Sequence, residues 1–175
     1  NPEFRDDRNE GTPVEVTFNG DLRDGQKKAA DALLRHDCGV LSATTAFGKT
    51  VLAAYLIATR KTNSLIIVHR RQLMEQWVER LSQFLGIPPK SIGTMGGGRK
   101  KLTGNIDIAL MQSLVRKGVV NDLVGNYGHV IIDECHHVPA VNFELVARRA
   151  KAKFVLGLSA TTLRKTCSKS GFATD

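Results

Sequence analysis

Short runs of consecutive apolar residues recur along most of the chain. They occupy 39–43, 64–69, 106–111, 129–134 and 154–160. None of them alternates apolar with polar positions, as a strand with one face in water would. The runs therefore predict short strands that are buried on both faces.

Between these runs the apolar residues have helical spacing. In 70–86, Leu73, Trp77 and Leu81 recur every fourth residue, which predicts an amphipathic helix with Trp77 in its core-facing stripe. Similar spacing predicts helices over 22–37, 49–61 and 141–151. Strands that alternate with helices are typical of an α/β fold in three layers, with a mostly parallel central sheet.

The two ends of the chain differ from this pattern. The first four residues, "NPEF", resemble a cloning remnant, and the polar, acidic segment that follows has no periodicity. We therefore expect a loose lead-in over 1–21, a single domain over 22–165 and a trailing tail over 166–175. In such a fold, ligands bind beyond the carboxyl ends of the strands.

Composition and charge narrow the class of protein. The chain has 175 residues, 42% of them hydrophobic and 24% charged, as expected of a globular domain. It offers no apolar run long enough to span a membrane and no secretion signal, so we expect no membrane partner and a cytoplasmic location.

The net charge of +8 is unevenly distributed along the chain. Residues 1–21 carry six acids and two bases, a net of −4, which leaves +12 on the remainder and favours a nucleic-acid partner.

The segment "ATTAFGKT", Ala43–Thr50, follows the first apolar run and opens a predicted helix. Backbone N–H groups at a helix N-terminus bind phosphate, a lysine can reach the terminal phosphates of ATP, and a hydroxyl can hold Mg²⁺. Lys49 and Thr50 supply the last two groups. Ala46 occupies a position where glycine is common, and it would strain the loop if its φ were positive.

The segment "VIIDECHH" follows another apolar run. Asp133 at the strand end can hold Mg²⁺, and Glu134 can orient or deprotonate an attacking water. A solvated strand end is one alternative. A zinc site is another, but adjacent cysteine and histidine residues rarely converge on one ion and no second ligand pair has suitable spacing.

These segments together carry a resemblance. "LRDGQ", "ATTAFGKT", "IIVHRRQLMEQW", "DECH" and "LSAT" resemble, in order and spacing, the motifs of superfamily-two helicases and translocases, over roughly residues 22–165. The third segment is similar in sequence to the corresponding motif of the repair-helicase and restriction-enzyme branches. The resemblance implies the first of two RecA-like P-loop NTPase lobes, which hydrolyses ATP with Mg²⁺ to move along DNA once it is paired with the second lobe.

The resemblance also implies roles for particular residues. Gln26 would recognise adenine, with Arg23 beside it, and Glu134 would act as the catalytic base with Lys49 on the phosphates. The nucleotide loop comprises Ala43, Thr44, Thr45, Ala46, Phe47, Gly48, Lys49 and Thr50. Mg²⁺ would be held by Thr50 and Asp133, and nucleotide state would be relayed by His136, Ser159 and Thr161.

Nucleic acid would contact a third set: Arg70, Arg71, Gly97, Gly98, Gln112 and Ser113. Arginine at a helix start opposes the helix dipole, so a phosphate partner explains Arg70 and Arg71 better than solvent does.

Two alternatives to a DNA motor remain open at this point. One is a module that binds nucleotide or nucleic acid without catalysis, and the other is an RNA helicase.

Overall fold

The chain folds around one large sheet, whose strands run in the order β10-β1-β9-β8-β2-β5-β3-β4. A computed structural model describes residues 6–160 and 173–174. The strands are β1 (Cys38–Ser42), β2 (Ser64–Val68), β3 (Gly93–Gly96), β4 (Arg99–Lys101), β5 (Ile106–Leu110), β8 (His129–Ile132), β9 (Phe154–Ser159) and β10 (Ala173–Thr174). Every pairing within this sheet is parallel except the one between β3 and β4.

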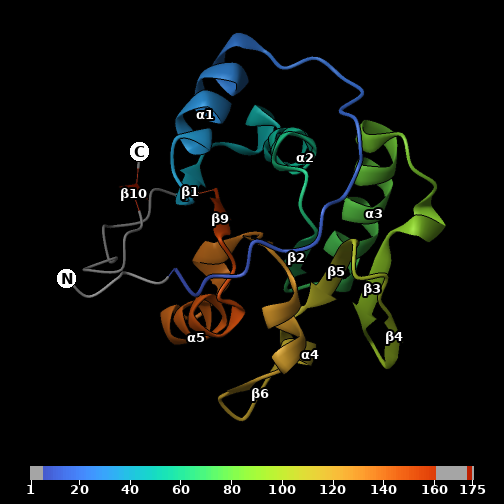
Figure 1. The fold of residues 1–175 in the computed structure, drawn as a ribbon, viewed down its shortest axis with the longest axis vertical. Helices are drawn as coiled ribbons and strands as arrows, with labels where there is room; N and C mark the ends of the chain where they lie inside the picture. Colours follow the sequence, from blue (N-terminus) through green and yellow to red (C-terminus); the bar gives the residue numbers. More distant parts are fainter. Residues whose placement is uncertain (1–5, 161–172, 175) are drawn as a thin grey trace.

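Helices cover both faces of this sheet, which confirms the three-layer α/β prediction (Figure 1). The helices are α1 (Asp24–Leu34), α2 (Lys49–Arg60), α3 (Arg71–Leu85), α4 (Met111–Leu114) and α5 (Ala140–Ala150). The central strands bury side chains on both faces: in β2, Ile66 packs with α2 and α3, and Ile67 packs with the layer that contains α5. No helix in the described part of the chain is long and apolar enough to cross a membrane.

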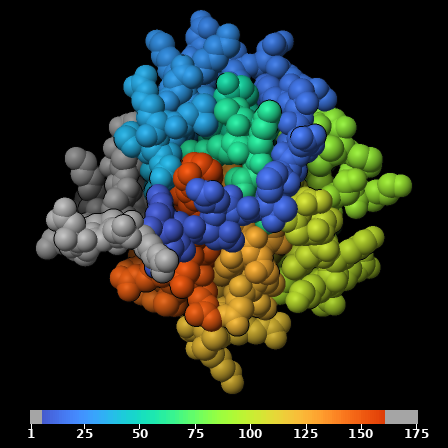
Figure 2. Space-filling view, in the orientation of Figure 1, coloured from blue at the N-terminus to red at the C-terminus, as the bar shows by residue number. Residues whose placement is uncertain are grey.

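The acidic lead-in is not loose where the structure describes it. Val14 is 9% exposed and belongs to the core on the α2 side. The backbone N–H of Thr12 donates to Asn63 Oδ1 at 2.9 Å, and the Thr62 hydroxyl donates to the Glu10 carbonyl at 2.7 Å. The segment therefore crosses the amino ends of the strands, and in Figure 2 its dark-blue atoms lie across that face. The domain boundary at residue 21 stays a prediction.

The glycine-rich segment 96–98 lies in a β-hairpin. Gly97 and Gly98 form the tight connection of a hairpin in which β4 pairs antiparallel with β3. Both have positive φ, 59° and 82°, a conformation that glycine adopts at little cost. The basic residues of β4 are exposed at the edge of the sheet, where lysine side chains discourage pairing with another chain.

The residues after Ile106–Leu110 hold two elements that the hydrophobic pattern did not indicate. The hairpin of β6 (Val115–Arg116) and β7 (Val119–Val120) forms a separate two-stranded sheet. Strands of two residues are too short to give a periodic signal. In Figure 2 the gold atoms of this hairpin protrude from the body of the domain.

Candidate nucleotide and nucleic-acid site

The predicted site segments meet along one edge of the sheet. Because the strands are parallel, the residues that follow β1, β9, β8, β2, β5 and β3 all lie at their carboxyl ends. In spatial order these are the loop after Ser42, Ser159, the Asp133–Glu134 pair, the segment after Val68, Gln112 and the Gly97 turn. The predicted nucleotide residues lie toward β1 and the predicted nucleic-acid residues lie toward β3.

The loop between β1 and α2 leads directly into the N-terminus of α2, the end of a helix at which phosphate groups commonly bind. Residues Thr45–Phe47 form a short 3₁₀ turn, and Gly48, with φ 79° and ψ 52°, connects it to the first residue of α2. Ala46 is not among the residues with positive φ. The alanine therefore introduces no backbone strain into the loop.

Lys49 folds back over this loop. Its Nζ donates to the carbonyl of Ala43 at 2.9 Å and lies 3.4 Å from the carbonyl of Thr44. The ammonium group thus lies where the loop curves around it, and backbone carbonyls are its partners in this state. Phosphate oxygens would offer it a stronger, charge-assisted interaction.

Arg23 and Gln26 both reach the loop from the start of α1. Arg23 Nη2 donates to the carbonyls of Ala46 and Phe47 at 2.8 and 2.7 Å, and Gln26 Nε2 donates to Phe47 at 2.7 Å. Gln26 Oε1 also accepts the backbone N–H of Arg23 at 2.8 Å. These contacts place both residues beside the loop, and adenine recognition by Gln26 stays a prediction.

Asp133 is held in an unusual environment for a carboxylate. It is 9% exposed, its Oδ2 accepts the indole N–H of Trp77 at 2.7 Å, and its Oδ1 accepts the backbone N–H of Glu134 at 2.8 Å. Burial raises the pKa of Asp133 above its ordinary value, although these two hydrogen bonds oppose the shift. A buried carboxylate of this kind is stabilised by a nearby cation.

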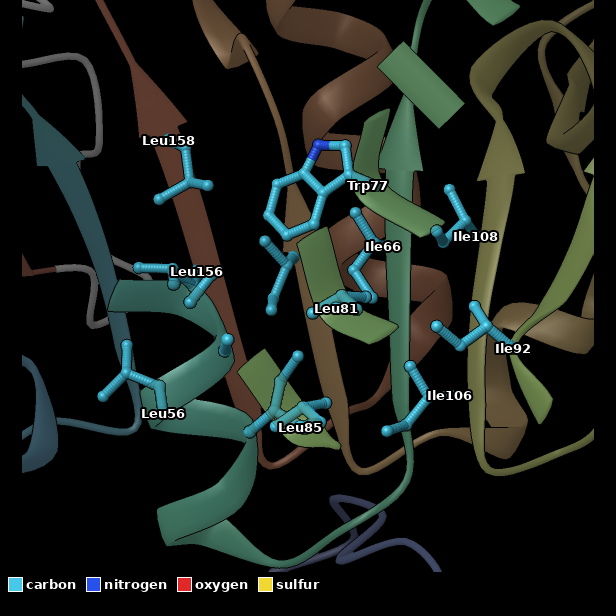
Figure 3. Packing of buried hydrophobic residues seen from close by; sticks show 14 of the residues in the cluster. Leu56, Ile66, Trp77, Leu81, Leu85, Ile92, Ile106, Ile108, Leu156 and Leu158 are labelled. Carbon is cyan, nitrogen blue, oxygen red and sulfur yellow. The ribbon is translucent and has the colours of Figure 1, made fainter. Parts of the chain in front are cut away.

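The sequence pattern correctly places Trp77 in the core but does not indicate its bond to Asp133. The ring is 2% exposed and packs among residues of α2, α3 and the central strands. In Figure 3 its nitrogen lies on the side of the ring away from Leu81. Trp77 therefore fills the core and orients the candidate metal-binding carboxylate.

Glu134 has a left-handed backbone, with φ 46° and ψ 47°. Few residues other than glycine adopt this conformation, which here also occurs at Lys61, Lys117 and Lys151. The Glu134 Oε2 lies 3.2 Å from His69 Nε2, at the end of β2. His69 is a second residue of the site that the sequence pattern did not single out.

His136 and Ser159 are brought together. The Ser159 hydroxyl lies 3.2 Å from His136 Nδ1, and the backbone N–H of Ala160 lies 3.4 Å from the same atom. Burial, with a contribution from neighbouring His137, lowers the pKa of His136 below its ordinary value, which favours a neutral ring with Nδ1 as acceptor. Thr161, predicted to join this relay, lies outside the described residues.

The predicted nucleic-acid residues form a second group on the same edge. Arg70, Arg71 and Gln112 are exposed, and Ser113 is partly exposed. A Cβ atom placed on Gly97 would lie 3.5 Å from Arg71 Nη1, so the glycine turn and the start of α3 are neighbours. Gln112 Nε2 donates to the carbonyl of His69 at 3.1 Å.

The donor set near the loop fits magnesium better than a softer metal. The carboxylate of Asp133 and the hydroxyl of Thr50 are oxygen donors, which Mg²⁺ prefers, and burial leaves the Asp133 charge in need of a cation. Among residues 6–160, no three side chains of histidine, cysteine, aspartate or glutamate gather into a metal site. Any Mg²⁺ here would therefore share its coordination with water and a nucleotide.

Comparison with known proteins agrees with this geometry. The protein family described as the type III restriction enzyme, res subunit, matches residues 19–164. The DNA 3'-5' translocase XPB2 of Sulfurisphaera tokodaii is 32% identical over 82% of this chain and 31% of its own length. The putative DNA 3'-5' helicase Rad25 of Halobacterium salinarum is 33% identical over 92% of this chain and 27% of its own length.

Solved structures show the same fold. The UvsW structure from bacteriophage T4 superimposes with a TM-score of 0.70 at 17% identity, covering 89% of this chain and 36% of that one. The SWI2/SNF2 ATPase core of Sulfolobus solfataricus, solved with double-stranded DNA, gives 0.65 at 18% identity, covering 88% and 34%. The fold is thus that of a RecA-like helicase lobe. The chain spans about 30% of the length of the curated relatives that it matches.

Proposed function

We propose that this chain, which belongs to the type III restriction enzyme res subunit family, is the ATP-binding lobe of a DNA-directed helicase or translocase. One observation carries the proposal: the loop that leads to Lys49 and an acidic pair, Asp133 and Glu134, lie on the same sheet edge as an exposed basic group. A binding module without catalysis would not need a second carboxylate, that of Glu134, directly after the candidate metal ligand Asp133.

The nucleotide would lie against the loop, with Lys49 exchanging its backbone carbonyls for phosphate oxygens. Thr50 and Asp133 would hold Mg²⁺, which offsets the charge on the phosphates when it is bound. Glu134 would orient the attacking water and accept its proton. Arg23 and Gln26 would support the loop from α1, and Gln26 would also recognise adenine.

The second lobe and the location of the protein are further parts of the proposal. In phosphoryl transfer a positively charged group from a second protein surface commonly completes the site, and an arginine of this kind is worth about 10³–10⁵ in rate. We infer that the second RecA-like lobe supplies it and that the isolated chain hydrolyses ATP slowly. The proposed setting is cytoplasmic.

DNA is the favoured nucleic-acid partner. The two relatives at 32% and 33% identity are named for DNA, while a 29% identical relative from Acanthamoeba polyphaga mimivirus is named a putative ATP-dependent RNA helicase. Arg70 and Arg71 would contact phosphates of the DNA, with Gly97 and Gly98 beside them. Gln112 and Ser113 would continue the same surface.

Replacing Arg70 and Arg71 with alanine should weaken the salt dependence of DNA binding. Each neutralised phosphate contributes about −0.9 to the log–log slope of affinity against salt on duplex DNA, so losing two contacts flattens the slope by roughly two. Fluorescence anisotropy at several salt concentrations measures this slope. The control replaces Arg148 and Arg149, two exposed arginines of α5 that pair with Glu144 and Asp122. If both double variants retain the parent slope, the phosphates of the DNA do not contact the start of α3.

A further inference from the structure

The catalytic candidate Glu134 is in contact with His69. The His69 Nε2 and Glu134 Oε2 atoms are 3.2 Å apart, and the two side chains are 20% and 34% exposed. Both ring nitrogens of His69 are buried from solvent, and neither makes a hydrogen bond of ordinary geometry within the described residues. The polar neighbours of the ring are the Glu134 carboxylate and the ring of His137, whose centroid lies 5.3 Å from that of His69.

This contact lies on the side of Glu134 away from the nucleotide loop. Glu134 follows β8, whose neighbours in the sheet are β9 and β2. The loop follows β1, which lies beyond β9, whereas His69 follows β2. The contact with His69 thus draws the carboxylate toward β2, in the direction opposite to the phosphates that Glu134 would have to serve.

The backbone of His69 is joined to the proposed nucleic-acid surface. Arg70 and Arg71 follow it directly and are exposed, and Gln112 Nε2 donates to its carbonyl at 3.1 Å. Arg71 also lies beside the Gly97 turn. Phosphates that bind Arg70, Arg71 or Gln112 would therefore displace the backbone of His69, whose ring contacts Glu134.

We propose that His69 is a positioning residue that restrains Glu134 until nucleic acid binds. In the free state the imidazole holds the carboxylate on the β2 side. A phosphodiester bound at Arg70, Arg71 and Gln112 shifts His69 and releases Glu134 toward the loop. This inference rests on the proposed function, since it assigns a regulator to the base of the proposed hydrolysis.

The test is single-turnover hydrolysis of γ-labelled ATP by the chain in excess, with and without a mixed-sequence single-stranded DNA oligonucleotide. Without DNA, His69→Ala should hydrolyse about two- to fivefold faster than the parent, the range that a partly exposed polar contact between two side chains supports. Its affinity for ATP should be unchanged. DNA should raise the parent rate by a similar factor and leave the His69→Ala rate unchanged.

Three variants separate the outcomes. His69→Gln keeps a donor toward Glu134 and should restore the slow parent rate, and His36→Ala, at an exposed histidine after α1, should behave as the parent. The Lys49→Ala variant measures the background rate of ATP hydrolysis, without the lysine proposed to bind the phosphates. If Lys49→Ala hydrolyses as fast as the parent, the proposed function itself fails.

If Lys49→Ala is inactive while His69→Ala is no faster than the parent, only the restraint by His69 is overturned. The same holds if DNA stimulates His69→Ala as strongly as the parent.

Discussion

Replacing Trp77 with phenylalanine should destabilise the domain by about 2–4 kcal/mol, because the buried Asp133 carboxylate loses a charge-assisted hydrogen bond and the core loses ring volume. The loss leaves an acceptor without its partner at a site that water reaches poorly. The pKa of Asp133 should then rise further, since the indole N–H opposes the effect of burial. Urea unfolding followed by circular dichroism measures the change in the free energy of unfolding.

A double-mutant cycle separates the hydrogen bond from the packing. In an Asp133→Ala background the indole has no carboxylate to donate to, so Trp77→Phe should cost at least about 1 kcal/mol less than in the parent. An equal cost in both backgrounds would show that Trp77 acts only through packing. The orientation of Asp133 would then have to come from the Glu134 backbone N–H alone.

Replacing Glu134 with glutamine should reduce the residual ATP hydrolysis by about 100-fold or more, because a positioned general base contributes about 10²–10⁴ in rate. Glutamine has nearly the same shape but cannot accept the proton of the attacking water. Binding of ATP should change little, since in the proposed site the phosphates would interact with Lys49 and the loop rather than with Glu134. Single-turnover hydrolysis and a parallel binding titration distinguish the two effects.

The matched control is Glu144→Gln, which alters an exposed glutamate on α5 that pairs only locally with Arg148. It should hydrolyse ATP at the parent rate. A Glu134→Gln variant that keeps the parent rate would remove Glu134 from catalysis. Fast, DNA-stimulated turnover by the parent chain alone would contradict the need for a second lobe.

The elements that the sequence predicts well are those whose pattern is local. The strand at Ser64–Val68 is apolar at four of its five positions, and the helix at Arg71–Leu85 has its stripe at Leu73, Trp77 and Leu81, so burial alone specifies them. The shared placement of the motifs also follows, because parallel strands bring their carboxyl ends to one edge. The conformation of Ala46 required the structure, since one substitution in a loop does not reveal its φ.

The contacts within the site depend instead on strand order. Trp77 and Asp133 are 56 positions apart, and His69 and Glu134 are 65 apart. They meet because β8 lies next to β2, which the alternation of strands and helices does not determine. The contacts of the N-terminal segment cannot be predicted from the sequence for a related reason: its partners are the amide of Asn63 and the Thr62 hydroxyl, far along the chain and outside any periodic pattern.

The central claim is that the loop at Ala43–Thr50 binds ATP together with Mg²⁺, and isothermal titration calorimetry of ATP into the chain tests it most directly. The parent should bind ATP in the presence of Mg²⁺, and Lys49→Ala should bind at least about tenfold more weakly, a loss of about 1.4 kcal/mol. Lys28→Ala, at an exposed lysine of α1, is the matched control and should bind as the parent does. Equal affinities of the parent and Lys49→Ala would contradict the assignment of this loop as the nucleotide site.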